Sequence, residues 1–367
     1  MTLAQELQQR ALDLGVPLSV QMDLTYRCNE RCVHCYLDHQ DHGEMTAAEI
    51  CGVLRQLADS GVFYLCFSGG EVFLRRDFFE ILQYARSLLF CVKVKTNAFM
   101  IGEREADMLA KAAVDSVQVS VYSRDPAVHD AITLLPGSLR RTLEGIRRLR
   151  ARGVRVVVAN VVMRQNYGHS AGVKELAMEL GADFTVDPTI TPMMNGDRSV
   201  LELNINNGQL HQVFRDPLLV SNPDEFCAPP SAVDEDALDA LPCSAGHTFC
   251  YISPYGDVYP CVQFPLPSGN VRQQSFQEIW RDSPQLAEVR SIRARDLDTC
   301  SGCVHLGGCT RCPGLAYMEG NMRGPSSQDC EKSATRTGIP SANMRKRIHT
   351  QTLPQLVQIA ITSDSSL

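Results

Sequence analysis

Residues 19–36 read SVQMDLTYRCNERCVHCY, and this stretch decides how the rest of the chain is interpreted. Its first part, Ser19–Leu24, is a short apolar and β-branched run that predicts a strand. Cys28, Cys32 and Cys35 follow at once, with three and two residues between them. The whole chain has fifteen cysteines. In a reducing compartment so many thiols indicate metal ligands or catalysts rather than disulfides.

Three cysteines are an unusual number for a metal site. A structural zinc ion takes four ligands, and although His34 and His39 are nearby, no obviously spaced fourth ligand completes this set. A redox dithiol is another alternative. We favour an iron-sulfur cluster held by three cysteines, because such a cluster leaves one iron open to a small molecule.

From Leu18 to Pro188 the chain alternates short β-branched runs with helical patterns, which is typical of βα units and a parallel sheet. Strands are expected at Ser19–Leu24, Val62–Ser68, Val92–Thr96, Ser116–Val121, Val154–Val162 and Asp183–Val186. Helices are expected from a capping box at Thr46 and Glu49 to Gly61, and near Asp77–Leu88, Glu103–Ala112, Leu139–Arg152 and Ser170–Leu180. Six units predict an open, partial (β/α)6 TIM-like barrel with its active site at the C-terminal strand ends.

Composition excludes several other classes of protein. The chain has 367 residues, 44% of them hydrophobic and 21% charged, which is ordinary for a globular protein. A net charge of −7 gives no reason to expect a nucleic-acid partner. No apolar run is long enough for a membrane span and Met1–Arg10 is polar, so we expect no membrane association and a cytoplasmic location.

The periodicity divides the chain into five expected parts. Apolar periodicity fades after about Asn195, and residues 217–241 are rich in Pro, Asp and Ser. From Leu241 onward, cysteines and glycines set the pattern instead. The expected parts are an N-terminal segment (1–17), the barrel (18–205), a linker (206–241), a small cysteine-rich domain (242–335) and a C-terminal tail (336–367). The basic Met344–Arg347 run suggests a solvated tail, with a partner-docking segment as the alternative.

The chain resembles the radical S-adenosylmethionine superfamily. Its hallmark, Cys-x3-Cys-x2-Cys followed by an aromatic residue, is matched by Cys28, Cys32, Cys35 and Tyr36. Ser68-Gly69-Gly70-Glu71 matches the family's Gly-Gly-Glu motif, although Val72 replaces the usual proline. The resemblance implies that the three cysteines hold a 4Fe-4S cluster whose open iron binds S-adenosylmethionine. The implied cofactor contacts are Tyr36 beside the adenine, Gly69, Gly70 and Glu71 at the amino group, and Thr96, Asn97 and Ser120 at the methionine carboxylate and ribose.

A contact common in the family is missing from the expected place. Many relatives carry an arginine after the residue equivalent to Ser120, and His129–Thr133 lacks one. Arg140 or Arg164 could supply the contact to the cofactor carboxylate, and the sequence does not choose between them.

Eight more cysteines form a C-terminal array, enough for two four-cysteine clusters. The array resembles the SPASM domain of radical S-adenosylmethionine enzymes that modify peptides. The resemblance implies a first auxiliary 4Fe-4S cluster on Cys243, Cys250, Cys261 and Cys312, and a second on Cys300, Cys303, Cys309 and Cys330. The chain would then hold three clusters in all. A zinc ribbon on Cys300, Cys303, Cys309 and Cys312 is the alternative, but it leaves the other four cysteines unexplained.

The implied activity is the generation of a 5′-deoxyadenosyl radical that oxidatively modifies a residue of a ribosomally made peptide or protein, forming a thioether or C–C crosslink. A sulfatase-maturing or tetrapyrrole side-chain-modifying enzyme is the alternative. A non-catalytic iron-sulfur electron carrier is a remote one, because an open iron would serve it no purpose. Asp187, at the sixth strand end, is the expected base.

The resemblance also implies partners for this chain. They are a peptide or protein substrate and an electron donor such as flavodoxin or ferredoxin. The seventeen residues before Leu18 are too few for a leader-binding module. A leader would therefore need a separate binding protein or the tail, unless the substrate has no leader.

Overall fold

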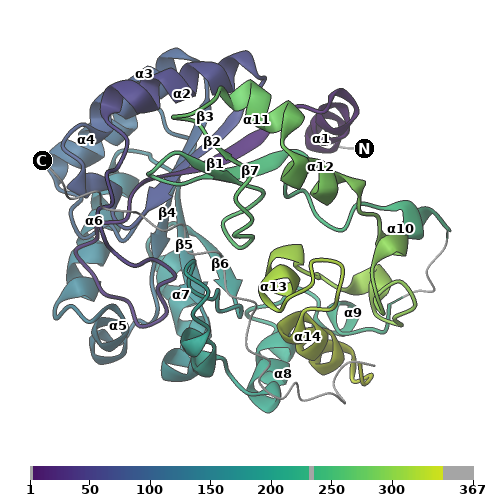
Figure 1. The fold of residues 1–367 in the computed structure, drawn as a ribbon. Helices are drawn as coiled ribbons and strands as arrows, with labels where there is room; N and C mark the ends of the chain where they lie inside the picture. The colour runs from purple at the N-terminus through teal and green to yellow at the C-terminus, as the bar shows by residue number, and fades with distance from the viewer. Residues whose placement is uncertain (1–2, 231–234, 342–367) are drawn as a thin grey trace, which may run out of the picture.

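The computed structural model describes residues 3–230 and 235–341 (Figure 1). Six parallel strands run in chain order along one sheet. They are β1 (Ser19–Thr25), β2 (Tyr64–Gly69), β3 (Cys91–Thr96), β4 (Ser116–Ser120), β5 (Val156–Val161) and β6 (Asp183–Asp187). The predicted partial barrel of βα units is confirmed. The Met344–Arg347 run lies outside the described residues.

Helices between the strands cover the outer face of the sheet (Figure 1). They are α2 (Ala47–Asp59), α3 (Phe78–Ser87), α4 (Glu103–Lys111), α5 (Pro126–Thr133), α6 (Ser138–Ala151) and α7 (Ser170–Glu179). The predicted capping box at α2 is present, because Thr46 Oγ1 accepts from Glu49 N and the Glu49 carboxylate accepts from Thr46 N. Gly61 follows α2 with φ +88°, which a glycine adopts without strain.

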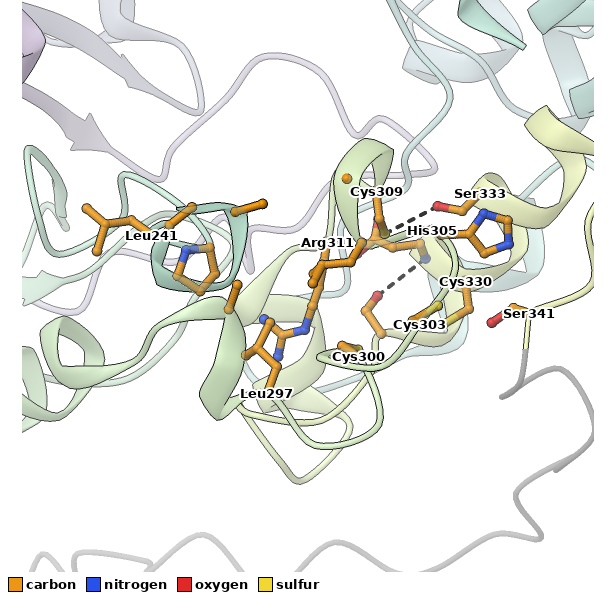
Figure 2. A pocket seen from close by; sticks show the side chains of 18 residues that line it. Leu241, Leu297, Cys300, Cys303, His305, Cys309, Arg311, Cys330, Ser333 and Ser341 are labelled. Atoms are coloured by element: carbon orange, nitrogen blue, oxygen red, sulfur yellow. Dashed lines mark hydrogen bonds between the residues drawn. The ribbon is translucent and has the colours of Figure 1, made fainter. Parts of the chain in front are cut away.

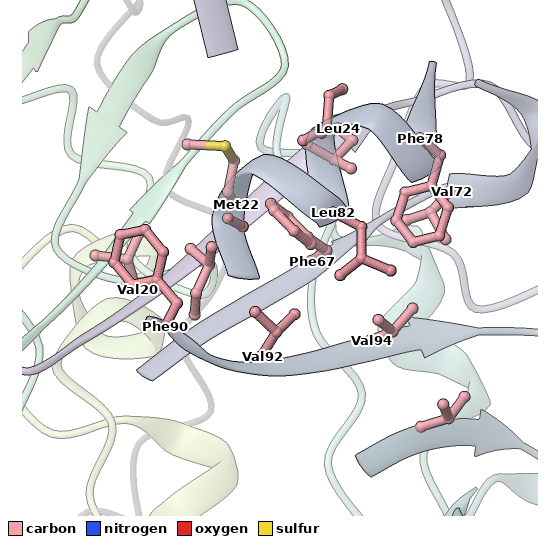
Figure 3. Close-up of a cluster of buried hydrophobic side chains, with 14 of the residues drawn as sticks. Val20, Met22, Leu24, Phe67, Val72, Phe78, Leu82, Phe90, Val92 and Val94 are labelled. Carbon is pink, nitrogen blue, oxygen red and sulfur yellow. The ribbon is translucent and has the colours of Figure 1, made fainter. Parts of the chain in front are cut away.

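The main core lies between this sheet and the outer helices. Alternate residues of β1, Val20, Met22 and Leu24, are fully buried and pack with Phe67 of β2 (Figure 3). The residues between them, such as Asp23, must point to the opposite face because successive strand side chains alternate. The inner face of the sheet is therefore polar where the outer face is apolar.

The sheet contains three strands that the sequence did not predict. β7 (Phe249–Ile252) pairs with β1 in parallel, with Ser19 opposite Phe249 and Met22 opposite Ile252. β8 (Asp257–Tyr259) and β9 (Gly269–Asn270) extend the sheet as antiparallel strands. The cysteine-rich region thus begins inside the sheet of the barrel.

Helix α1 (Leu3–Leu14) precedes the barrel. Further helices follow the barrel in the C-terminal half. They are α8 (Asn207–Arg215), α9 (Pro223–Phe226), α10 (Glu235–Asp239), α11 (Phe276–Asp282), α12 (Pro284–Ser291), α13 (Pro313–Met318) and α14 (Ser327–Thr337). α8 lies in the segment expected as a linker; it has a capping box and contacts α14. No helix among the described residues is long and apolar enough to cross a membrane.

Candidate active site

The loop after β1 brings three thiols together, as the sequence predicted for this strand end. Cys35 N donates to Cys32 O at 3.0 Å, and Val33 N donates to Ile132 O at the end of α5 at 3.0 Å. Burial raises the pKa of Cys28 to about 12 and also raises the pKa values of Cys32 and Cys35. Because thiolates are the ligand form, a bound metal would be needed to keep these buried thiols ionised, and the donor set fits an iron-sulfur cluster.

The two glycines of the Gly-Gly-Glu motif bring the end of β2 against the backbone that leads to Cys28. A Cβ on Gly69 would lie 2.2 Å from Thr25 O, and one on Gly70 would lie 2.3 Å from Arg27 O. Gly70 N donates to Thr25 O at 2.8 Å, and Glu71 N donates to Arg27 O at 2.9 Å. These glycines are therefore required for the close packing of the cysteine loop itself.

The Glu71 carboxylate joins the ends of β2 and β3. It is fully buried and accepts hydrogen bonds from Thr96 Oγ1 at 2.8 Å, Asn97 N at 2.9 Å and Phe73 N at 3.2 Å. Burial raises the pKa of Glu71 to about 7. The structure thus brings together three of the residues expected at the cofactor, and any bound ammonium group would share these carboxylate oxygens.

Other expected cofactor residues also border the cysteine loop. Asn97 Nδ2 donates to Asn29 Oδ1 at 2.9 Å and lies 3.9 Å from Cys28 Sγ. Ser120, at the end of β4, and the Cys32 thiol both lie close to the Tyr122 hydroxyl. Tyr122 is not among the site residues that the sequence predicted.

Tyr36 and Asp187 occupy different environments. Burial raises the pKa of Tyr36 well above its ordinary value, and the Tyr36 carbonyl accepts from Met194 N at 3.1 Å. Asp187 is exposed at the end of β6, and its Oδ1 accepts from Thr189 N at 2.8 Å. The Asp187 side chain therefore caps the turn that follows β6.

The two arginines considered for the cofactor carboxylate lie on separate elements. Arg140, on α6, pairs with Glu144 at 3.0 Å and its side chain is 72% exposed. Arg164, after β5, donates to Asn204 O at 2.9 Å.

The C-terminal cysteines fall into two groups. Cys250, Cys261, Cys243 and Cys312 form the first set, in which charge interactions link Cys261 to the other three. Cys300, Cys303, Cys309 and Cys330 form the second set and line one cavity of about 240 Å³ (Figure 2). These are the same two groups that the resemblance implied. Cys312 lies with the first set, beside Cys243 and near Gln263.

The described residues hold no three His, Cys, Asp or Glu side chains gathered as one metal ion requires. A cluster makes no such demand, since each thiolate binds its own iron.

Comparison with known proteins identifies the family. Residues 22–171 match the Radical SAM superfamily, and residues 243–304 match SPASM, an iron-sulfur cluster-binding domain. The PqqA peptide cyclase of Xanthomonas campestris pv. campestris (strain 8004) is 32% identical over 90% of this chain and 91% of that one. The chain belongs to the radical SAM superfamily.

Two further proteins are similar to this radical SAM protein along most of its length. The AdoMet-dependent heme synthase of Methanosarcina barkeri is 28% identical over 83% of this chain and 93% of that one. Streptococcus suis SuiB shares the fold. Its structure bound to S-adenosylmethionine has a TM-score of 0.71 at 20% identity, covering 89% of this chain and 81% of that one. Its structure bound to the precursor peptide SuiA has a TM-score of 0.70 at 19% identity, covering 88% and 78%. The predicted family, SPASM domain and enzyme class are confirmed.

A buried polar network fills the inner face of the radical SAM barrel, and sequence reasoning missed it. Asp23 Oδ2 accepts from Tyr251 Oη at 3.0 Å, and Asp23 Oδ1 accepts from Gln21 Nε2 at 3.2 Å. Tyr251 Oη is 2.8 Å from Tyr26 Oη, and Lys95 Nζ donates to Gln21 Oε1 at 2.9 Å. Burial raises the pKa of Asp23 to about 6. A single acidic residue in a predicted strand was the available signal.

Two residues of this network act electrostatically on two of the cysteine groups. Burial raises the pKa of Cys35, and the negative charge of Asp23 adds to that rise. Burial also raises the pKa of Cys261 to about 12, while the positive charge of Lys95 acts in the opposite direction. Charged side chains of the barrel are thus within electrostatic reach of both the first loop and the first C-terminal set.

Proposed function

We propose that this radical SAM protein is an oxidative peptide maturase that forms a thioether or C–C crosslink in a ribosomally made peptide. The observation that carries the proposal is the presence of two separate four-thiol sets in addition to the three-thiol loop. A redox-neutral reaction would need no such electron acceptors. The peptide substrate is inferred from the names of two similar proteins, a peptide cyclase and an enzyme solved with its precursor peptide.

The residues of the barrel mouth would hold and orient the cofactor. Cys28, Cys32 and Cys35 would hold a 4Fe-4S cluster that, with S-adenosylmethionine bound, supplies the radical that removes a substrate hydrogen. Glu71 keeps Thr96 and Asn97 at the edge of this site through the hydrogen bonds that it accepts from Thr96 Oγ1 and Asn97 N. Gly69, Gly70, Ser120 and Tyr36 complete the proposed cofactor site.

An oxidative crosslink removes two hydrogens from the peptide, one as a hydrogen atom and one as a proton and an electron. Asp187 is the proposed acceptor of the proton, because its exposed carboxylate stands at a strand end of the barrel. The two C-terminal cysteine sets would hold auxiliary 4Fe-4S clusters that accept the electron, making three clusters in all. Flavodoxin or ferredoxin would supply the initiating electron, and a separate protein would present a leader if the substrate has one.

A second candidate is modification of a tetrapyrrole side chain. The similarity to an AdoMet-dependent heme synthase over 83% of the chain favours it. The two functions differ in substrate, so one experiment separates them.

The test uses reconstituted, chemically reduced enzyme with S-adenosylmethionine. Short peptides encoded beside its gene and a set of porphyrins would be incubated separately. We expect 5′-deoxyadenosine together with a peptide that has lost two hydrogen atoms, measured by mass spectrometry. Modification of a porphyrin alone would establish the second candidate. 5′-Deoxyadenosine with an unchanged peptide mass but exchanged hydrogen would indicate a redox-neutral reaction instead.

A further inference from the structure

Arg311 stands in the wall of the cavity formed by the second cysteine set (Figure 2). It follows Cys309 by two residues, and it is only 8% exposed. The same cavity is lined by Cys300, Cys303 and Cys330. A permanently charged guanidinium therefore lies beside the four thiols that the proposed function assigns to one cluster.

The guanidinium is fixed in place but its charge is not neutralised. Arg311 Nε donates to Gly324 O at 2.8 Å, and Nη2 donates to the carbonyls of Gly324 and Met322. Nη1 is buried and has no hydrogen-bond partner. Among the described residues no ion pair of Arg311 is found, and the buried carboxylate of Asp329, which lines the same cavity, pairs with Lys332 at 3.7 Å. A buried guanidinium that no anion pairs with is destabilising, and an anion in the cavity would pair with it.

The charge of Arg311 faces the same cavity as the four thiols. A cluster held by four thiolates is anionic and gains one further negative charge on reduction. Hydrogen bonds to its sulfurs and nearby charge are the means by which a protein sets its reduction potential.

We propose that Arg311 is the counter-ion of the second auxiliary cluster and raises its reduction potential. This inference rests on the proposed function, because it requires a cluster on Cys300, Cys303, Cys309 and Cys330. The idle Nη1–H group and the unpaired charge favour the reduced state, which carries more negative charge. The second auxiliary cluster would thereby become a better electron acceptor.

Arg290 offers a matched control from the first set. It is a partly buried arginine close to Cys250, it stacks over Trp280 at 4.3 Å, and its Nη2 also has no partner. Arg290 does not line the cavity of the second set. Its removal should leave the potential of the second auxiliary cluster unchanged.

The experiment is a redox titration followed by electron paramagnetic resonance. It uses full-length protein with Cys28→Ala, Cys32→Ala and Cys35→Ala, so that only the auxiliary clusters contribute. Arg311→Met should lower one midpoint so that the oxidised-to-reduced ratio at the original midpoint rises at least tenfold, about 59 mV for one electron. Arg290→Met should not move that transition.

Iron content decides between the remaining outcomes. An Arg311→Met protein that binds both clusters with unchanged midpoints overturns this inference and leaves the proposed cofactor content intact. Fewer than two clusters before the Arg311 change overturn the cofactor content and the inference together. A shift of the same transition by Arg290→Met also contradicts the assignment.

If Arg311→Met loses iron, Arg311→Lys replaces it, because lysine keeps the charge. That variant should bind both clusters with the affected ratio within tenfold of the parent. A larger shift shows that charge is not the cause. Loss of iron shows that Arg311 serves only to hold residues 322–324, and either result overturns the inference.

Discussion

The barrel and the segment from residue 294 to residue 341 are stabilised in different ways. The barrel, β7–β8 and helices α11 and α12 contribute to one continuous buried apolar cluster. No residue of 294–341 belongs to that cluster; Tyr317 and Met322 only pack against a small one around Phe264. The difference teaches that apolar burial is concentrated in the barrel, and we therefore expect the last segment to depend on what its five cysteines bind.

The largest predicted effect tests this difference with two sets of variants. Replacing Cys28, Cys32 and Cys35 with alanine should abolish S-adenosylmethionine cleavage and remove one third of the iron. The fold should survive because none of these thiols belongs to the main apolar cluster of the barrel. Replacing Cys300 and Cys309 with alanine should also remove one third of the iron, but cleavage of S-adenosylmethionine should continue. Residues 294–341 should then become accessible to protease.

Limited proteolysis, circular dichroism and the iron count measure these outcomes. Cys51→Ala is the control, because Cys51 lies on α2, outside the three cysteine groups. This substitution should leave protease resistance, circular dichroism and iron content unchanged. Protease resistance of 294–341 in the Cys300 and Cys309 variant would show that this segment folds without its cluster.

A smaller effect is predicted where the barrel supports the first cysteine loop. Gly70→Ala places a Cβ 2.3 Å from Arg27 O. This oxygen belongs to the backbone, so relieving the clash requires a shift of the main chain. We expect a loss of about 2–3 kcal/mol in the free energy of unfolding. Gly52→Ala, in α2, meets nothing within 4 Å and should stabilise the protein by about 0.5–1 kcal/mol.

Chemical denaturation of both glycine variants measures the difference. If Gly70→Ala were as stable as wild type, the glycine would be needed for the cofactor and not for the loop.

The smallest predicted effect concerns the ion pair that joins the two halves. Arg272, after β9, donates to Glu49 of α2 at 2.9 Å and 3.3 Å. Both side chains are partly exposed, so a double-mutant cycle with Glu49→Gln and Arg272→Met should give a coupling of about 0.5–1 kcal/mol. Hydrogen bonds from Thr46, then Arg272, lower the pKa of Glu49 to about 2. The coupling should therefore stay constant from pH 8 to pH 6.

The pair Arg140 and Glu144, within α6, gives the reference for an exposed i,i+4 pair, about 0.3–0.5 kcal/mol. A coupling between Glu49 and Arg272 no larger than this would show that the ion pair contributes nothing special to the junction.

Local sequence patterns were sufficient to predict the barrel. The strands β1–β6 and the cap at Thr46 depend on apolar spacing and on residues three positions apart, which are visible in the chain. β7–β9 were missed because they have two to four residues each, too few to show a period. Helix α8 was missed because it lies where apolar spacing had faded, and its packing partner α14 is more than a hundred residues away.

The same distinction between local patterns and long-range contacts applies to the candidate site. Strand-end residues such as Glu71 and Thr96 could be predicted to meet, since parallel strands end at one edge. The partners of Asp23 could not, because Tyr251 is 228 residues further along the chain. The absence of an ion-pair partner for Arg311 among the described residues likewise results from packing, which no local pattern reveals.

The pairing of β7 with β1 also constrains how the chain assembles. Ser19 pairs with Phe249, so one edge of β1 stays without its partner until the ribosome has made some two hundred further residues. Closing so long a loop slows folding, and an open strand edge invites pairing with other chains. During synthesis the incomplete barrel therefore has an exposed edge of β1 directly beside its cysteine loop. Pairing of β7 with β1 covers this edge once the C-terminal half has been made.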